Sequence, residues 1–335
     1  MVKRRSFAVE WRSAGRRSPL AAVGEHVLSG CLGAAAVLGF APFHYWPITI
    51  AALAGLYLLI DRAPNWRRAA ARTWVFGLGF FAAGLQWIGN SFFVDAERFG
   101  AMAIPAVAGL AASLAIFPAI AGALTRMLAS DMRPLAFSAA WCLTELLRGM
   151  ILSGFPWNLI GYVWTVSDVT LQLASVVGAY GLSFITIFAA STIGWGISSS
   201  VSRQRRLFAL AVAASTLAMP WVYGSWRLAY GATNEDSTLR IRIVQGNIPQ
   251  NMKWRIEDRE RVLARYTDLS NRPAEGVFHA VIWPETAVPY VWDGGGVLVR
   301  RLAAVLPPGA ILITGIIRQQ NGAGAERFYN SVVAV

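Results

Sequence analysis

The chain has 335 residues, of which 56% are hydrophobic and only 14% are charged, and its formal net charge is +12. A soluble globular domain carries about 25% charged residues, so this composition excludes an ordinary soluble protein and indicates an integral membrane protein. The basic residues occur in short clusters between apolar segments rather than in one stripe, which argues against nucleic-acid binding.

Seven segments are apolar and long enough to cross a bilayer, which takes about 20 residues for a helix. They cover residues 24–42, 46–60, 73–93, 101–125, 134–153, 170–199 and 207–224. The short connection between the first two predicts a tight helical hairpin. Gly178 and Gly181 are expected to break the sixth segment into an interfacial piece and a span.

The Lys and Arg residues between these segments predict the orientation. With the N-terminus inside, the inner segments hold Lys3, Arg4, Arg5, Arg12, Arg16, Arg17, Arg62, Arg67, Arg68, Arg72, Arg126, Arg133, Arg203, Arg205 and Arg206. The outer loops hold Arg98 alone. By the positive-inside rule, we expect residues 1–23 to form a basic cytoplasmic tail, residues 24–224 a transmembrane bundle and residues 225–335 an outward-facing domain.

The cysteines and histidines give no support for a metal site or a disulfide framework. Cys31 and Cys142 both fall in apolar segments, where buried cysteine behaves as a small hydrophobic residue. His26, His44 and His279 are scattered and lack the spacing of metal ligands. We therefore expect no metal and no other cofactor, and the outer domain has no cysteine to bridge.

After residue 224 the pattern changes to that of an α/β domain. Strands are predicted at 239–248, 278–283, 310–317 and 328–335, and helices at 257–270 and 294–306. The apolar residues on one face of the first helix are Val262, Leu263, Tyr266 and Leu269. Gln320-Asn321-Gly322 predicts a turn between the last two strands. This order of elements indicates a layered α/β sheet that is incomplete at residue 335.

The segment Val281-Ile282-Trp283-Pro284-Glu285 is a buried-strand pattern that leads directly to a carboxylate. A strand that ends in Pro-Glu would present the carboxylate at the edge of the sheet, where loops build active sites. Glu285 is therefore a candidate catalytic residue. The alternative is an ordinary surface carboxylate at the end of a strand.

Motifs in both halves of the chain occur together. In the outer domain they are Val244-Gln245-Gly246-Asn247-Ile248-Pro249-Gln250, Lys253-Trp254, Trp283-Pro284-Glu285-Thr286-Ala287-Val288-Pro289 and Tyr329-Asn330-Ser331. In the bundle they are Phe40-Ala41-Pro42-Phe43, Gly84-Leu85-Gln86-Trp87-Ile88 and Gly154-Phe155-Pro156-Trp157-Asn158-Leu159-Ile160-Gly161-Tyr162. In content and order, over nearly the whole chain, they resemble apolipoprotein N-acyltransferases, which are membrane-bound members of the nitrilase (carbon-nitrogen hydrolase) superfamily.

The resemblance implies a nitrilase-like sandwich for the outer domain and an enzyme of bacterial lipoprotein maturation. The catalytic cysteine of such an enzyme would take an acyl chain from a phospholipid donor and hold it as a thioester. The acyl chain would then pass to the N-terminal amine of the diacylglyceryl-cysteine of an apolipoprotein acceptor. The expected location is the inner (plasma) membrane, with a cytoplasmic N-terminus and a periplasmic nitrilase-like domain.

The catalytic set that the resemblance implies is a glutamate base, a lysine that stabilises the oxyanion and a cysteine nucleophile. Glu285 matches the base, whereas the lysine and the cysteine of the family follow later strands. The chain contains only Lys3, Lys253, Cys31 and Cys142, and none of them matches these positions. We therefore expect a C-terminally truncated chain that is inactive alone.

Trp157 and Trp254 are candidate substrate-binding residues. Trp157 lies in the Phe-Pro-Trp loop and would line an entrance for acyl chains; the alternative is an ordinary residue of the interfacial aromatic belt. Trp254 would belong to a loop over the site, and core packing is its alternative.

Glu145 and Arg148 share one helix face near the outer end of the fifth segment. Ionisable residues inside a membrane indicate a functional site by default. A structural ion pair that docks the outer loop is the reading that we favour.

Two other functions remain open at this point. The first is a membrane-tethered amidase of the same superfamily, which would pass the acyl group to water and release free fatty acid. The second is a naturally truncated, inactive relative that acts as a membrane partner of another enzyme. A stop codon directly after Val335 in the intact gene would favour the second.

Overall fold

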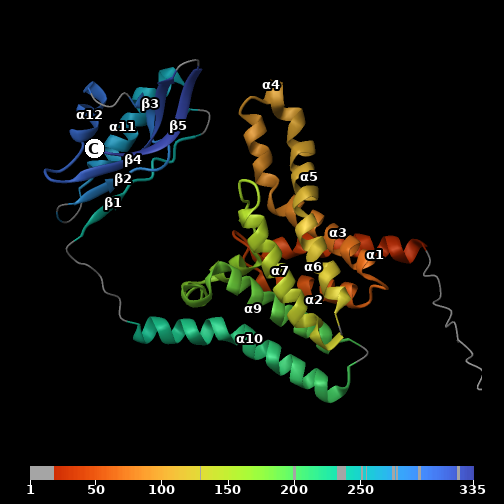
Figure 1. Ribbon diagram of the computed structural model, residues 1–335. Coiled ribbons are helices and arrows are strands. Elements are labelled where there is room, and N and C mark those ends of the chain that lie inside the picture. The colour runs from red at the N-terminus through yellow and green to blue at the C-terminus, as the bar shows by residue number, and fades with distance from the viewer. Residues whose placement is uncertain are drawn as a thin grey trace, which may run out of the picture. The chain divides into compact units, whose positions relative to one another are not determined.

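The computed structural model describes residues 19–128, 130–198, 201–231, 239–249, 252–253, 255–273, 276, 278–292, 296–322 and 325–335. The chain divides into two compact units, Met1–Gly231 and Ala232–Val335. The first unit is helical and the second is α/β (Figure 1). The basic residues expected in the tail 1–18 lie outside the described part of the chain.

The first unit is built from helices that follow the predicted apolar segments. They are α1 (Pro19–Ala36), α2 (Trp46–Asp61), α3 (Trp66–Gly84), α4 (Ala96–Phe99), α5 (Ala103–Leu114), α6 (Ile116–Met127), α7 (Arg133–Met150), α8 (Asp168–Leu171), α9 (Ala174–Gly196) and α10 (Arg203–Tyr230). Short 3-10 helices between them are η1 (Val37–Gly39), η2 (Gln86–Phe93), η3 (Gly100–Met102), η4 (Ser130–Met132) and η5 (Ile160–Val166).

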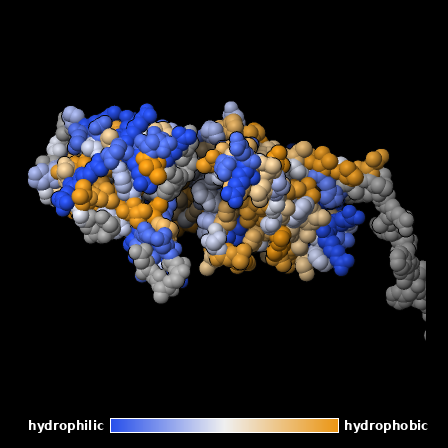
Figure 2. All heavy atoms as spheres, turned by 90° about the horizontal axis from the view of Figure 1, so that it is seen from above, coloured by the Kyte–Doolittle hydropathy of each residue, from blue (hydrophilic) through white to orange (hydrophobic). Residues whose placement is uncertain are grey.

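Within the described residues, three segments are long and apolar enough to cross a membrane. They are Ala96–Met127, Ala174–Gly196 and Arg203–Tyr230. Two shorter apolar helices are Val23–Gly39 and Trp46–Asp61. Hydrophobic residues cover much of the visible surface of the helical unit, and hydrophilic residues predominate on the visible surface of the α/β unit (Figure 2). The other membrane crossings that the sequence indicates remain predictions.

One of the expected segments ends earlier than expected, and another is interrupted by a glycine. The third was expected to continue to residue 93, but α3 ends at Gly84 and the chain continues as the 3-10 helix η2. A Cβ atom at Gly84 would lie only 1.9 Å from Nδ2 of Asn158, so the outer loop packs directly on this helix end. The sixth is broken at Gly178, where φ is 66°, while Gly181 remains helical.

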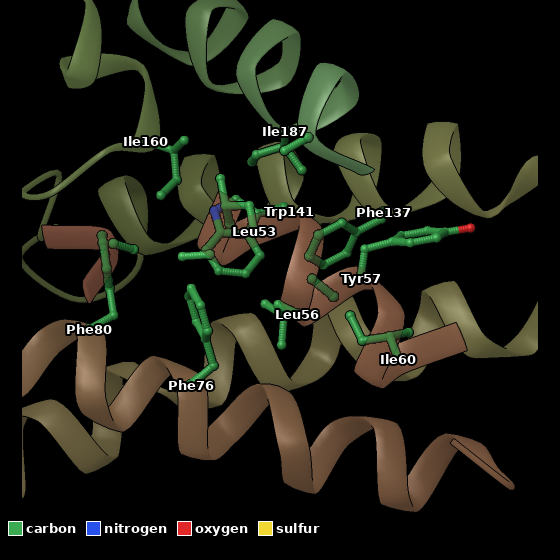
Figure 3. Close-up of a cluster of buried hydrophobic side chains, with 14 of the residues drawn as sticks. Leu53, Leu56, Tyr57, Ile60, Phe76, Phe80, Phe137, Trp141, Ile160 and Ile187 are labelled. Carbon is green, nitrogen blue, oxygen red and sulfur yellow. The ribbon is translucent and has the colours of Figure 1, made fainter. Parts of the chain in front are cut away.

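An aromatic core joins α2, α3 and α7 (Figure 3). Phe76 of α3 meets Trp141 of α7 edge to face, with ring centroids 6.0 Å apart. Phe137 packs against the same ring at 5.5 Å, and Tyr57 of α2 lies 6.5 Å from Phe137. Aromatic pairs in such tilted arrangements add about 0.5–1.5 kcal/mol each beyond the area that they bury. Glu145 lies one helical turn after Trp141, so the packing of Trp141 in this cluster fixes the direction in which Glu145 points.

Arginine side chains satisfy carbonyl groups at the carboxyl end of α2. Arg72 donates to the carbonyl oxygen of Leu59 at 2.5 Å, and Arg126 donates to that of Ala63 at 2.6 Å. Arg72, which is buried, also forms an ion pair with the partly exposed Glu25. The last carbonyls of a helix lack partners within the helix and carry its negative dipole end, so these arginines stabilise that end.

The second unit is a mostly parallel sheet with two helices. Its elements are β1 (Ile241–Ile243), η6 (Ile256–Asp258), α11 (Arg259–Ser270), β2 (Ala280–Ile282), β3 (Val288–Trp292), α12 (Gly296–Ala303), β4 (Ile311–Gly322) and β5 (Ala325–Ala334). β1 pairs with β2, β2 with β4 and β3 with β4 in parallel, and β4 pairs with β5 antiparallel. β4 continues through the predicted turn 320–322, and residues 323–324 lie outside the described part.

The sheet has one buried face and one open face. Leu312 and Ile316 of β4 are fully buried and pack in one cluster with residues of α11 and α12. On the other face, Ile243, Phe328 and Val332 are 80%, 58% and 74% exposed. Side chains alternate between the faces of a strand, so these apolar residues share the face opposite to the helices. Within the described residues, no element covers that face.

Glu260 connects three elements on the surface of this unit. Arg301 of α12 binds both carboxylate oxygens of Glu260, at 3.0 and 2.6 Å, and Tyr290 of β3 donates a further hydrogen bond. The Arg301 guanidinium, followed by the Tyr290 hydroxyl, lowers the pKa of Glu260 from 4.5 to about 2. A lowered carboxylate pKa stabilises the fold at high pH, because the unfolded chain binds the proton more readily.

We therefore expect Glu260→Gln to destabilise the protein at pH 7, where the carboxylate is charged in both states. The difference from wild type should shrink as the pH falls from about 4.5 to about 2. Thermal unfolding of both proteins across this pH range measures it. If the difference in melting temperature stays constant over this pH range, the lowered pKa of Glu260 does not contribute to stability.

Candidate active site

A turn connects β2 and β3, which both pair with the same side of β4. β2 and β3 lie end to end along this side: Ala280 pairs with Ile311, and Val288 pairs with Ile316. The chain advances eight residues from Ala280 to Val288 while β4 advances five. The excess residues leave the sheet as a turn at Glu285 and Thr286.

Glu285 therefore lies at an interruption within the sheet, not at the end of a strand on its edge. The sequence did not predict β3, because Pro289 lacks the N–H that a ladder uses and is expected at strand starts, edges or bulges. The structure accommodates Pro289 inside an irregularity of the β3–β4 pairing, which lies between Val288 and Val291.

Gly315 of β4 lies directly beneath the turn. A Cβ atom at Gly315 would lie 2.6 Å from Cα of Glu285 and 2.6 Å from the backbone nitrogen of Thr286. The N–H of Gly315 donates to the carbonyl oxygen of Pro284 at 3.3 Å. The turn can rest on the sheet because residue 315 has no side chain.

Trp283 anchors the turn on the buried side. Its ring is 2% exposed and stacks on Tyr266 of α11, with centroids 5.2 Å apart. Its Nε1 donates to Oγ of Ser270 at 2.9 Å. The Trp-Pro-Glu motif thus combines a core anchor with a carboxylate that lies on the open side of the sheet.

The Glu285 side chain is exposed and is contacted from β5. Nδ2 of Asn330 donates a hydrogen bond to Oε1 of Glu285. Nζ of Lys253 lies 3.5 Å from the backbone carbonyl oxygen of Glu285, so it contacts the turn and not the carboxylate. In the sequence, Asn330 stood out only as part of the motif Tyr329-Asn330-Ser331. The pairing of β5 with β4 brings Asn330 to Glu285.

The loop after β1 forms a separate pocket. Residues 246–249 and α11 line an open cavity of about 490 Å³, with Arg261 and Arg265 among its walls. Glu285 is not one of its lining residues. Trp254, the candidate for a loop over the site, lies outside the described residues.

In the helical unit, Glu145 and Arg148 bind the loop that follows α7. Both side chains are buried, with 4% and 3% exposed. Nη1 of Arg148 donates to the carbonyl oxygens of Phe155 and Trp157, at 2.8 and 2.6 Å. Oε1 of Glu145 accepts from the N–H of Ile160 at 3.0 Å. The two residues together hold this loop by its backbone.

The ion pair that we expected between Glu145 and Arg148 is absent from the ion pairs of the described residues. Glu145 instead accepts from Nε1 of Trp141 at 3.1 Å. The guanidinium of Arg148 lies over the ring of Phe81, 5.1 Å from its centroid. Both side chains therefore bind to the loop backbone and to aromatic rings, and the sequence does not reveal these partners.

The loop held in this way presents Trp157. Its ring packs against Trp87 of η2, with centroids 5.4 Å apart, and the two side chains are 52% and 49% exposed. Two motifs far apart in the sequence therefore form one half-exposed aromatic pair. The sequence did not indicate that Trp87, in the motif Gly84-Leu85-Gln86-Trp87-Ile88, is the partner of Trp157.

Gly315→Ala is expected to displace the Glu285 turn. A methyl group at 2.6 Å from two backbone atoms forces the turn away from β4, at a cost of about 1–3 kcal/mol in stability. Thermal unfolding of the variant and of wild type measures this cost. An unchanged melting temperature would contradict the close contact between Gly315 and the turn.

The apolar helices are typical of a membrane-bound protein, and the α/β unit carries an exposed carboxylate. Comparisons show which proteins the chain resembles. Residues 32–192 match the model of the apolipoprotein N-acyltransferase N-terminal domain. An apolipoprotein N-acyltransferase of Rhodopseudomonas palustris is 34% identical over 325 residues, covering 92% of this chain and 61% of the relative. One from Caulobacter vibrioides is 36% identical over 314 residues, covering 90% and 58%. Over most of its length, the chain is similar to apolipoprotein N-acyltransferases.

The aligned region extends beyond the helical unit into the α/β unit. A third relative, from Brucella melitensis, is 35% identical over 311 residues, covering 89% of this chain. The chain spans between 57% and 61% of the length of these three relatives.

Proposed function

We propose that this chain belongs to an enzyme that transfers an acyl chain from a phospholipid to the N-terminal amine of the diacylglyceryl-cysteine of apolipoproteins. The observation that carries the proposal is the position of Glu285. Its carboxylate lies on the open side of the sheet, above a glycine and beside an amide donor. The relatives' printed name, apolipoprotein N-acyltransferase, supports the substrate class.

In this proposal Glu285 is the general base. A cysteine thiol is only a few per cent ionised at neutral pH, so a carboxylate that takes its proton activates it. The thiolate attacks the ester carbonyl of the phospholipid, the proton passes to the departing alcohol, and a thioester forms. The neutral amine of the acceptor then attacks the thioester, and the thiol is regenerated.

Two groups of this mechanism have no counterpart among residues 1–335. They are the cysteine nucleophile and the lysine that balances the charge of the tetrahedral oxyanion. Cys31 and Cys142 belong to the helical unit, and Lys253 binds the backbone of the turn. We propose that residues 1–335 alone do not transfer acyl groups.

We propose further that the α/β unit is half of a nitrilase-like sandwich. The support is the open sheet face, on which Ile243, Phe328 and Val332 are each more than half exposed. A second sheet packed at about 10 Å would bury these residues. The Glu285 turn would then lie between the two sheets.

For the helical unit we propose seven crossings of the inner membrane, with the N-terminus cytoplasmic and the α/β unit periplasmic. The support is the distribution of arginine and lysine in the sequence and the apolar helices. Trp157 and Trp254 are proposed as substrate-binding residues. For Trp157, the support is the half-exposed ring pair with Trp87, which suits contact with acyl chains.

The test uses the polypeptide translated from the intact gene, purified in detergent and mixed with a phospholipid whose acyl chain is labelled. A synthetic diacylglyceryl-cysteine peptide is the acceptor. We expect labelled N-acyl peptide and, without acceptor, a labelled protein thioester. Labelled fatty acid without N-acyl peptide would identify an amidase instead. No product, together with a stop codon after Val335, would identify an inactive partner.

A further inference from the structure

We propose that Asn330 is a positioning residue that fixes the carboxylate of Glu285 for proton transfer. This inference rests on the proposed function, because it concerns the base of that reaction. The direct observation is the hydrogen bond from Nδ2 of Asn330 to Oε1 of Glu285. The bond joins β5 to the turn between β2 and β3, across the strand β4.

The strand register explains how Asn330 reaches the carboxylate. In the antiparallel pair, Gly315 lies opposite Val332 and Ile317 lies opposite Asn330. Opposite residues of such a pair point to the same face, and so do residues two apart in a strand. Asn330 therefore shares the open face with Gly315, on which the Glu285 turn rests. Because residue 315 has no side chain, the turn lies close to the sheet, where the amide of Asn330 contacts the carboxylate.

Each of the other described contacts to this turn holds its backbone. Gly315 donates to the carbonyl of Pro284, and Lys253 lies at the carbonyl of Glu285. Neither restrains the side-chain torsions of an exposed glutamate, which lose rotamer freedom when they are ordered. The amide of Asn330 is the contact that acts on the carboxylate itself.

An amide donor suits a carboxylate that must accept a proton. An ionised carboxylate only accepts hydrogen bonds, so the donor end of Asn330 must face it. The bond occupies Oε1 and leaves Oε2 to take the thiol proton. Asparagine orients the group without adding the positive charge that an arginine or lysine would place beside it.

Asn330→Leu keeps the approximate size of the side chain and removes the donor. We expect the rate constant for thioester formation to fall about 10- to 10²-fold, as for a reacting group that is no longer held in place. The KM for phospholipid and the melting temperature should not change. Asn330→Asp, with the same shape but no donor, should be impaired at least as much. Asn330→Gln retains the amide and should recover part of the rate.

Ser331→Ala is the matched control, because Ser331 is the next residue of β5 and points to the opposite face. The double variant Glu285→Gln/Asn330→Leu gives the deciding measurement. If Asn330 acts through Glu285, the double variant should be no slower than Glu285→Gln alone. Additive losses, or a wild-type rate in Asn330→Leu, would overturn the inference. Wild-type acylation in Glu285→Gln would instead overturn the proposed role of Glu285.

Discussion

Glu285→Gln is expected to lower the rate of thioester formation by about 10²- to 10⁴-fold, which is the usual contribution of a general base. Glutamine has nearly the volume of glutamate and can still accept a hydrogen bond from Asn330 through its amide oxygen. The turn over Gly315 should therefore stay in place, and the melting temperature should not change. Quenched-flow measurement of labelled thioester, in the enzyme from the intact gene, gives the rate.

Glu326→Gln is the matched control for this variant. Glu326 is an exposed carboxylate on β5, on the same strand as Asn330, and it lies opposite Asn321. Its replacement removes the same charge and should leave the rate unchanged. Thioester formation at the wild-type rate in Glu285→Gln would refute the role of Glu285 as the base, and a cysteine activated by another group would have to be sought.

Arg148→Met is expected to give the largest loss of stability, about 2–4 kcal/mol. The substitution leaves the carbonyl groups of Phe155 and Trp157, which are partly buried, without their donor. Each buried polar group without a partner costs about 1–3 kcal/mol. Thermal unfolding in detergent measures the overall loss.

The loop after α7 should respond before the rest of the bundle does. Limited proteolysis between residues 150 and 160 should become faster in Arg148→Met, because the backbone there has lost its main donor. Arg148→Lys keeps the charge but not the planar donor geometry, so it should lie between wild type and Arg148→Met. Arg98→Gln, at an exposed arginine over Phe99, is the control and should match wild type. Unchanged melting of Arg148→Met would show that the loop does not depend on this contact.

Hydropathy alone located the helices of the bundle, but it gave close bounds only for some of them. α2 begins at Trp46 and ends at Asp61, close to the predicted 46–60. The end of α3 could not be predicted in this way. At the last residue of this helix, Gly84, the side chain of Asn158, which is distant in sequence, occupies the space that a side chain would take. No local pattern contains that contact.

The candidate site was predictable only in part for the same reason. The pattern before Glu285 indicated both a strand and a carboxylate, and β2 is that strand. The strand β3, the glycine beneath the turn and the amide of Asn330 all depend on how β4 pairs on its two sides. Gly315 was visible as a glycine in a strand, a position that often marks a close approach of backbone.

The separate pairing of β2 and β3 makes the turn between them a site that tolerates changes in length. Each strand keeps its own register on β4, so residues added at Glu285 or Thr286 would lengthen the turn without shifting either strand. Deletion of one residue within β2 would instead move the following side chains of that strand to the opposite face. Directed evolution could therefore vary this turn in length and composition, and so change the reach of its carboxylate, while the sheet beneath stays as it is.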